Sequence, residues 1–279
     1  MFTDKRIAFV GPGQMAEAMI AGLLRNHLLP AENILASGPL VEHNVLLHEK
    51  YGITAMWDNA AAASRADVVI LSVKPQHADA ALSQLAGKIR PDALVLSIVA
   101  GLSVARIAAG LSHPLVARAM PNTPARIGQG ISVFTTARAV DERHRAWSQE
   151  ILAALGQVLF VEEEEMLDMA TALSGTGPAY VFLFMEAMVD AGVHLGFPRH
   201  MAETLVSQTV LGSAQFFQKS PDTHLAQLRN TVTSPAGTTA AALFELEKAG
   251  FRTAIGNAVW AAYERSVELG RNVKNHKPE

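Results

Sequence analysis

The sequence contains no cysteine among its 279 residues. This absence excludes disulfide frameworks, thiolate metal sites and a cysteine nucleophile. Charged residues make up only 18% of the chain, against about 25% in a typical protein. The net charge is -3 and no basic stripe occurs, so we expect no nucleic-acid partner. Hydrophobic residues reach 49%, which is enough for a large core and excludes intrinsic disorder.

Signals for a metal site, a secretory signal and a membrane span are also missing. Neither His43 and His48 nor His194 and His200 have the spacing of metal ligands, so we expect no metal. The N-terminus leads into a four-residue apolar run, 7–10, which is shorter than the core of a signal peptide. No apolar stretch approaches the roughly 18 residues of a membrane span. We therefore predict a soluble, cytoplasmic protein that does not contact membranes.

The first part of the chain alternates short β-branched runs with helical stretches. Strands are predicted over 7–10, 33–37, 67–73, 94–99, 115–118, 131–134 and 158–161. Nearly continuous apolar strands separated by helices are typical of a parallel sheet that is covered on both faces. This pattern predicts an α/β fold, with an N-terminal doubly wound sheet of the Rossmann type over residues 1–162.

The second part, residues 163–279, is predicted to be an all-helical substrate and dimerisation domain. Helices are expected over 178–195, 198–218, 239–250 and 252–270, with proline at starts and glycine at ends. Between positions 166 and 218 the only charged residues are Asp168, Glu186, Asp190, Arg199 and Glu203. Helices that are apolar nearly all round belong in a buried core, so a second copy of the chain is expected to cover them.

A glycine motif follows the first predicted strand and precedes a helix. Gly11 suits a tight turn, Gly13 lets the backbone approach a pyrophosphate, and Ala16 permits close packing of helix on strand. The phosphates would lie at the helix N-terminus, where free N–H groups and the dipole favour an anion. The pattern predicts NAD(P) binding, and a purely structural turn is the alternative.

The choice of cofactor is less sharply defined by the sequence. An NAD site usually has an acidic residue at the end of the second strand, but this chain has Ser37-Gly38-Pro39 there. The absence of an acid favours NADPH, although no arginine between Arg25 and Arg65 could hold a 2′-phosphate, so NADH is also possible. Lys74-Pro75 follows the third major strand and is predicted to contact the cofactor, with a simple strand stop as the alternative.

Hydroxyl groups gather in the segment 231–239, just ahead of a predicted helix. Five Ser or Thr residues and Gly237 occur there. Hydroxyls and free N–H groups at a helix start can cradle a carboxylate. A helix cap needs only one hydroxyl, so substrate binding is favoured over capping.

Six segments together resemble the pyrroline-5-carboxylate reductase family. They are GPGQMA (11–16), SVKPQ (72–76), SIVAG (97–101), MPNTPA (120–125), SGTGPAYVF (174–182) and VTSPAGTT (232–239). The resemblance covers nearly the whole chain. It implies NAD(P)H-dependent reduction of 1-pyrroline-5-carboxylate to L-proline, the last step of proline biosynthesis, by a homo-oligomer built from dimers.

The resemblance also implies which residues form the site. The cofactor contacts would be Val10, Gly11, Pro12, Gly13, Gln14, Met15, Ser37, Asn59, Ser72, Val73, Lys74, Pro75 and Ala100. The substrate contacts would be Glu164, Ser234, Gly237, Thr238 and Thr239. Thr239 is the implied catalytic residue, with its hydroxyl facing the imine nitrogen. Ala236 departs from the family, which commonly has glycine there.

Two other functions fit parts of the pattern. A 3-hydroxyacid dehydrogenase-like oxidoreductase shares the plan of the two domains, but it needs a lysine after the linker, and none occurs between Met166 and Gln218. A non-catalytic NAD(P)-binding sensor would not need the hydroxyl-rich loop. An imine reductase also fits what is missing, because an imine nitrogen can arrive already protonated and then requires no strong general acid.

Overall fold

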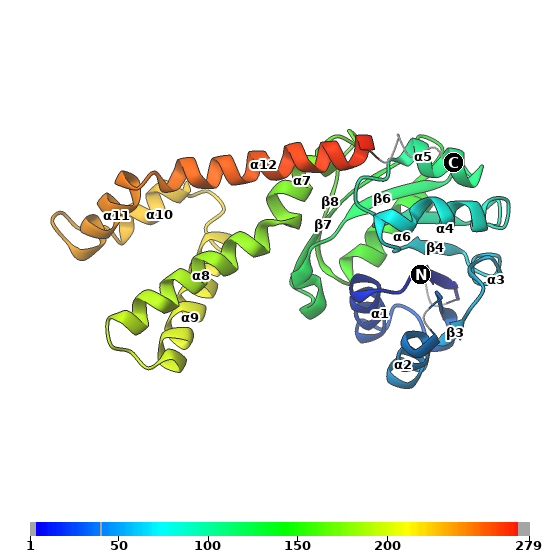
Figure 1. Cartoon of the computed structure of the whole chain (residues 1–279), viewed down its shortest axis with the longest axis horizontal. Coiled ribbons are helices and arrows are strands. Elements are labelled where there is room, and N and C mark those ends of the chain that lie inside the picture. The colour runs from blue at the N-terminus through cyan, green and yellow to red at the C-terminus, as the bar shows by residue number, and fades with distance from the viewer. Residues whose placement is uncertain (1–3, 40, 273–279) are drawn as a thin grey trace. The chain divides into compact units, whose positions relative to one another are not determined.

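The computed structural model describes residues 4–39 and 41–272, and its strands form one sheet (Figure 1). The strand order is β3-β2-β1-β4-β5-β6-β7-β8. The strands are β1 (Ile7–Val10), β2 (Ile34–Ser37), β3 (Thr54–Met56), β4 (Val68–Leu71), β5 (Leu94–Ser97), β6 (Val116–Met120), β7 (Gly130–Thr136) and β8 (Gly156–Phe160). β1 pairs in parallel with both β2 and β4, so the order reverses beside β1. This confirms the predicted doubly wound α/β fold followed by helices.

Alternation along each strand divides the apolar residues between two cores. Ile7 and Phe9 of β1 belong to a cluster that includes residues of α1 (Gln14–Arg25) and α6 (Glu142–Ala153). Ala8 and Val10 belong to the other cluster, with residues of α3, α4 and α5. These helices span Asn59–Ala63, Ala78–Leu85 and Val104–Leu111. Successive side chains point to opposite faces, so both faces of the sheet are covered, as the continuous apolar strands predicted.

The direction of β7 differs from a fully parallel sheet. β7 pairs with β6 in antiparallel fashion and with β8 in parallel. A parallel return needs a crossover of about a dozen residues or more, and the connector 121–129 holds only the short helix η3 (Thr123–Ile127). The sequence also gave no sign of β3, which has just three residues at the edge of the sheet.

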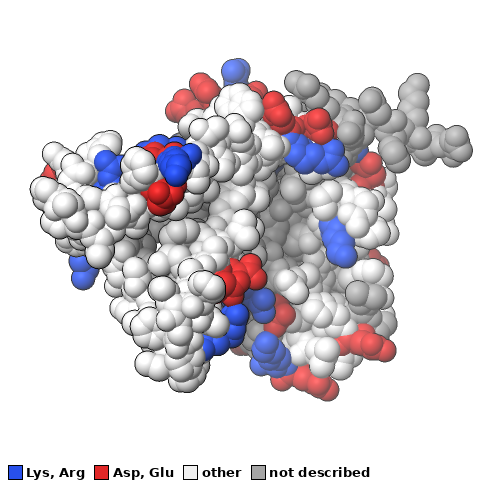
Figure 2. Space-filling view, turned by 60° about the vertical axis from the view of Figure 1, so that its left-hand side comes forward, with Lys and Arg blue, Asp and Glu red and all other residues white. Residues whose placement is uncertain are grey.

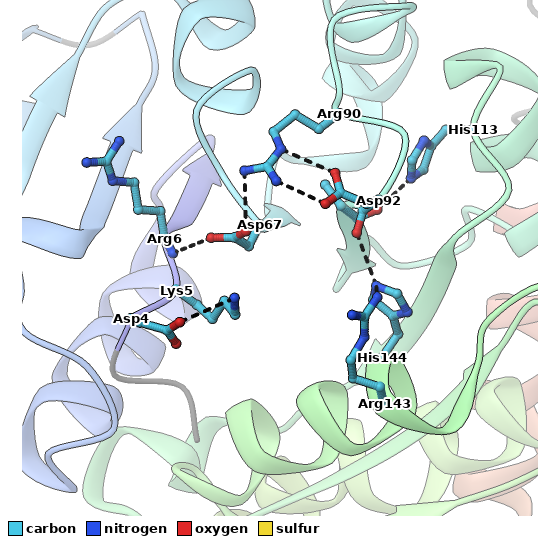
Figure 3. A network of polar contacts seen from close by, with 10 residues as sticks. Asp4, Lys5, Arg6, Asp67, Arg90, Asp92, His113, Arg143 and His144 are labelled. Carbon is cyan, nitrogen blue, oxygen red and sulfur yellow. Dashed lines mark hydrogen bonds and ion pairs between the residues drawn. The ribbon is translucent and has the colours of Figure 1, made fainter.

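Charged groups tie together the amino ends of the central strands (Figure 3). Arg90 bonds to Asp67, ahead of β4, at 3.3 Å and to Asp92, ahead of β5, at 3.0 Å. The Arg6 backbone N–H donates to Asp67 at 2.9 Å. The hydrogen bond from Arg90 lowers the pKa of Asp92. Because the glycine motif follows the other end of β1, this network is structural and separate from the candidate site.

Helical structure continues through the glycine-containing segment 174–177. Helix α7 (Met166–Ala170) continues through a π-helical turn, η4 (Thr171–Gly175), into α8 (Gly177–His194). Thr176 donates to the Thr171 carbonyl from its N–H at 2.8 Å and from its hydroxyl at 2.9 Å. These bonds satisfy backbone groups that the widened turn would leave open, which explains why helical structure persists. Single π-turns often occur at functional sites.

The described chain divides into two compact units. The first holds residues up to Thr176 and those from Ala262 onward, and the second is Gly177–Ala261. The second unit contains α8, α9 (Arg199–Gln218), α10 (Leu225–Thr231), α11 (Thr238–Lys248) and most of α12 (Phe251–Asn272). The domain boundary predicted near 162 falls just after β8, and the first unit continues past it.

Large apolar side chains remain exposed on the helices of the second unit. Leu183 and Leu195 are 67% and 81% exposed, and Figure 2 shows a broad surface on which charged groups form only small clusters. The buried cluster of this unit holds Val189, Ala202 and Val206. A monomer rarely leaves such a large apolar surface in water, so this surface has the character of an interface.

Candidate active site

The glycine motif forms the turn between β1 and α1. Gly11 has φ +78°, a conformation that favours glycine, and a Cβ there would lie 2.9 Å from Val73 Cα. Gly13 is the N-cap of α1, with no side-chain hydrogen bond to the helix start. A Cβ on Gly13 would meet no described atom within 4 Å. Packing therefore explains Gly11, whereas Gly13 leaves open space beside the free N–H groups of α1.

Neighbouring strand ends hold the glycine turn in place. The Ser72 hydroxyl donates to the carbonyls of Val10, at 3.1 Å, and Gly11, at 3.0 Å. The Gly11 N–H donates to the Ser37 carbonyl at 2.9 Å. His43, on α2 (Val41–Tyr51), donates from Nε2 to the Pro12 carbonyl. Sequence reasoning missed His43, because no local pattern reports a contact between residues so far apart in the chain.

Ser37 and Asn59 lie together at the carboxyl end of β2. The buried Ser37 hydroxyl donates to Asn59 Oδ1 at 2.8 Å, and Asn59 Nδ2 donates to Gln84 at 2.8 Å. A Cβ on Gly38 would lie 3.1 Å from Pro12 Cδ. Neutral hydroxyl and amide groups therefore stand where an NAD-selective site usually has a carboxylate.

An acidic residue in the first turn of α1 is paired with neighbouring side chains. Glu17, in the first turn of α1, accepts hydrogen bonds from Lys50 Nζ at 2.7 Å and from the Tyr51 hydroxyl at 3.0 Å. The hydrogen bond from Lys50 holds the pKa of the Glu17 carboxyl below its usual value. This pairing offsets the repulsion that Glu17 would exert on an anion at the start of α1.

The remaining predicted cofactor residues follow the neighbouring parallel strands. Val73 packs against Gly11, and Lys74 is the exposed N-cap of η2 (Pro75–His77). Among the described residues Lys74 makes no ion pair, so its ammonium group can meet a phosphate. Ala100 follows β5 and precedes Gly101, which has φ +72°. The carboxyl ends of β2, β1, β4 and β5 thus gather the predicted cofactor residues at one edge of the sheet.

These residues fit a dinucleotide. The free N–H groups at the uncapped start of α1 are donors for a pyrophosphate, and Gly13 leaves the space that this group requires. No acid lies at the end of β2, where the 2′-position of an adenosine ribose would lie.

The structure places the predicted substrate residue Glu164 in an ion cluster. Glu164 Oε1 accepts from Arg118 Nη1 at 2.8 Å and from the Val104 N–H at 2.9 Å. Arg118 lies on β6 and is 4% exposed. The sequence signal that could have indicated this cluster is a charged residue, Arg118, within the apolar run 115–120.

The hydroxyl-rich loop in the second unit leads into α11. Gly237 is the N-cap of α11 and no side chain caps the helix, so these hydroxyls are not elaborate caps. The hydroxyls of Thr231 and Thr233 donate to backbone carbonyls of α10, at 2.6 and 2.7 Å. Within the described ranges the hydroxyls of Ser234, Thr238 and Thr239 make no hydrogen bond. The start of α11 therefore offers free N–H groups and free hydroxyls together, which is the donor set that a carboxylate needs.

The loop also carries a strained residue. Ala236 has φ +56°, a conformation that is uncommon for residues other than glycine. The helix α10 that precedes the loop begins with a capping box, in which His224 Nδ1 accepts from the Ala226 N–H at 3.1 Å. Backbone strain such as that of Ala236 is common at ligand-binding sites.

Taken together, a glycine turn at the reversal point of a doubly wound sheet and a set of free donors on a helix define a dinucleotide-dependent oxidoreductase. Two family models match the chain: "NADP oxidoreductase coenzyme F420-dependent" over residues 6–101 and "Pyrroline-5-carboxylate reductase dimerisation" over residues 164–269. The chain belongs to the pyrroline-5-carboxylate reductase family.

Individual relatives are similar to this chain over nearly its whole length. The chain is 43% identical to pyrroline-5-carboxylate reductase of Synechocystis sp., covering 95% of this chain and 98% of that one. It is 42% identical to the enzyme of Pseudomonas aeruginosa, covering 96% and 98%. A solved Plasmodium falciparum pyrroline carboxylate reductase with NADP bound is 31% identical, covers 97% of this chain and 100% of its own, and has a TM-score of 0.88.

Proposed function

We propose that this protein reduces 1-pyrroline-5-carboxylate to L-proline with NAD(P)H, the last step of proline biosynthesis. Membership of the reductase family supports the reaction. The observation that carries it is the uncapped start of α11, where the hydroxyls of Ser234, Thr238 and Thr239 make no hydrogen bond to any residue that the structure describes. These donors suit the carboxylate of a small cyclic substrate.

In this proposal catalysis consists mainly of positioning. Ser234, Gly237 and Thr238 bind the substrate carboxylate, and the Thr239 hydroxyl orients the imine nitrogen. When bound, the reduced nicotinamide supplies the hydride. An imine that arrives protonated needs no general acid of its own, so a fixed geometry can provide most of the rate enhancement.

The proposed cofactor is NADPH, held by the residues that follow β1, β2, β4 and β5. The uncapped start of α1 binds the pyrophosphate, with Lys74 as a nearby cation. Ser37 and Asn59 lie at the ribose end, and their neutral groups do not repel a 2′-phosphate. NADH is the alternative cofactor, and the ratio of kcat/KM values for the two cofactors decides between them.

We further propose that the protein is a homo-oligomer built from dimers. Contrary to the expectation from the sequence, one described helical stretch, Met166–His194, is long and apolar enough, by length and composition alone, to cross a membrane. A family model for dimerisation covers this same stretch, which supports its burial against a second copy rather than in lipid. The cytoplasmic location stays a prediction, which fractionation of the producing cells would test.

The experiment mixes the purified protein with 1-pyrroline-5-carboxylate and either NADPH or NADH. We expect loss of the near-ultraviolet absorbance of the reduced cofactor, with a higher kcat/KM for NADPH. Cofactor binding without oxidation would instead favour the non-catalytic sensor. Turnover with a 3-hydroxyacid and NADP⁺, but none with the imine, would favour the dehydrogenase alternative.

A further inference from the structure

An ion cluster around the buried Arg118 bonds to the residue that follows the loop 98–103, and none of the proposed steps uses it. Arg118 Nη1 bonds to Glu164 at 2.8 Å, and Arg118 Nη2 lies 3.8 Å from Asp168 Oδ1. The Arg118 side chain is 5% exposed, and its Nε and Nη2 have no hydrogen-bond partner among the described residues. Burying such a charge is costly, and the two carboxylates beside it offset part of that cost.

One branch of this cluster reaches the start of helix α5. The Glu164 carboxylate accepts from the Val104 N–H at 2.9 Å, and Val104 is the first residue of α5. A carboxylate at a helix N-terminus satisfies a free donor and is favoured by the dipole. Since Ser103 directly precedes Val104, this bond fixes the end of the loop 98–103.

The other branch reaches the last part of helix α12. The Ser266 hydroxyl donates to Asp168 Oδ1 at 2.7 Å, and Ser266 is buried. Further along α12, Gly270 lies against the same loop, because a Cβ on Gly101 would be 3.2 Å from Gly270 N. The loop is therefore held at its end by Glu164 and at Gly101 by α12, and Arg118 lies beside both carboxylates.

We propose that Arg118, Glu164 and Asp168 are positioning residues that fix the loop 98–103 so that Ala100 receives the nicotinamide end of the cofactor. The inference rests on the proposed function, because the place of Ala100 beside the nicotinamide comes from the family resemblance. It gives Glu164 a role in cofactor binding through Val104 and α5. Direct contact with the substrate, which the resemblance implied, is the competing role.

The test compares binding constants for the cofactor and the substrate in the full-length protein. Glu164→Gln keeps an oxygen that can accept from Val104 but removes the charge that pairs with Arg118. Ser266→Ala removes the bond between α12 and Asp168 and leaves the pairing of Arg118 with Glu164 in place. For both variants we expect NADPH binding, measured by titration without substrate, to weaken by about threefold to tenfold, and KM for the imine to stay within about twofold.

Arg90→Met is the matched control, because Arg90 also bonds to two carboxylates but lies at the amino ends of the strands. It should leave the NADPH dissociation constant unchanged. Unchanged NADPH binding in folded Glu164→Gln and Ser266→Ala would overturn the inference, as would a rise in KM for the imine alone. If the wild-type protein binds NADPH but does not reduce the imine, the proposed function fails, while the comparison of NADPH constants still decides this inference.

Discussion

The two compact units of this chain bury their apolar residues to very different degrees. In the first unit, β1, β4 and β5 consist of buried residues, and helices cover both faces of the sheet. In the second unit, Val189, Ala202 and Val206 form the buried cluster, and large side chains such as Leu183 stay exposed. The central strands of the first unit bury their apolar residues within one chain, whereas the helices of the second unit leave large apolar side chains for a partner to cover.

This difference also separates two kinds of chemistry. The predicted cofactor residues belong to the first unit, and the substrate residues Ser234, Gly237, Thr238 and Thr239 belong to the second. Each large apolar side chain that assembly buries stabilises the oligomer by about 1.5 to 3 kcal/mol. Because the predicted cofactor residues belong to the first unit, we expect cofactor binding to survive changes that abolish assembly. Turnover should depend on both units, because the substrate residues named above belong to the second.

The largest effect is expected from a charge placed on the exposed helices. Leu183→Asp, on α8, should prevent association and abolish turnover, because an unpaired carboxylate would have to be buried in the interface. Light scattering would show a monomer or aggregates. Leu46→Asp is the control, since Leu46 is similarly exposed on α2 of the first unit, and its variant should assemble normally. An oligomeric, active Leu183→Asp variant would contradict the comparison.

The next largest effect, on kcat, is expected from a substitution at the start of α11. Thr239→Ala removes the hydroxyl proposed to orient the imine nitrogen, so kcat should fall by about 100-fold or more. NADPH binding should change little, because Thr239 belongs to the other unit. Thr239→Ser keeps a hydroxyl and should retain most of the activity. Full turnover by Thr239→Ala would remove this residue from the catalytic role.

Substitutions of the two glycines distinguish packing from cofactor contact within the first unit. Gly13→Ala places its methyl group in open space, so Tm should not change, whereas NADPH should bind about tenfold more weakly, or worse. Gly11→Ala should lower Tm as well, because its φ is +78° and its Cβ would clash with Val73. Unaltered NADPH binding by Gly13→Ala would place the pyrophosphate elsewhere.

The smallest effect concerns the stability of the first unit in acid. Asp141, the N-cap of α6, accepts from the His144 N–H at 2.9 Å, and this bond lowers the pKa of Asp141. A lowered folded-state pKa gives stability that is complete above the usual aspartate pKa of about 3.9 and is lost as pH falls through the folded value. Asp141→Asn should therefore lower the urea midpoint at neutral pH and match the wild type in acid. A difference that is constant with pH would argue against this charge effect.

The sequence predicted the features that depend on local pattern. Apolar runs predicted most strands, proline and glycine predicted the ends of the long helices, and Gly11 and Gly13 predicted the turn between β1 and α1. The reversed direction of β7 depends on the length of the connector, and the edge strand β3 was too short to detect.

Features that depend on distant contacts could not be read from the sequence. The bond from His43 to Pro12 and the pairing of Arg118 with Glu164 join residues far apart in the chain. The π-turn at 171–175 depends on hydrogen bonds from Thr176. The free hydroxyls at the start of α11 were predicted as a group, but their lack of capping bonds became visible only in the structure.

The central claim is that this chain couples a dinucleotide site to the reduction of a cyclic imine. The most direct measurement follows NADPH oxidation and proline formation in the same reaction with 1-pyrroline-5-carboxylate. The account predicts one L-proline for each NADPH oxidised, at a rate that Thr239→Ala lowers by about 100-fold. NADPH that binds to the protein but is not oxidised in the presence of the imine would contradict it.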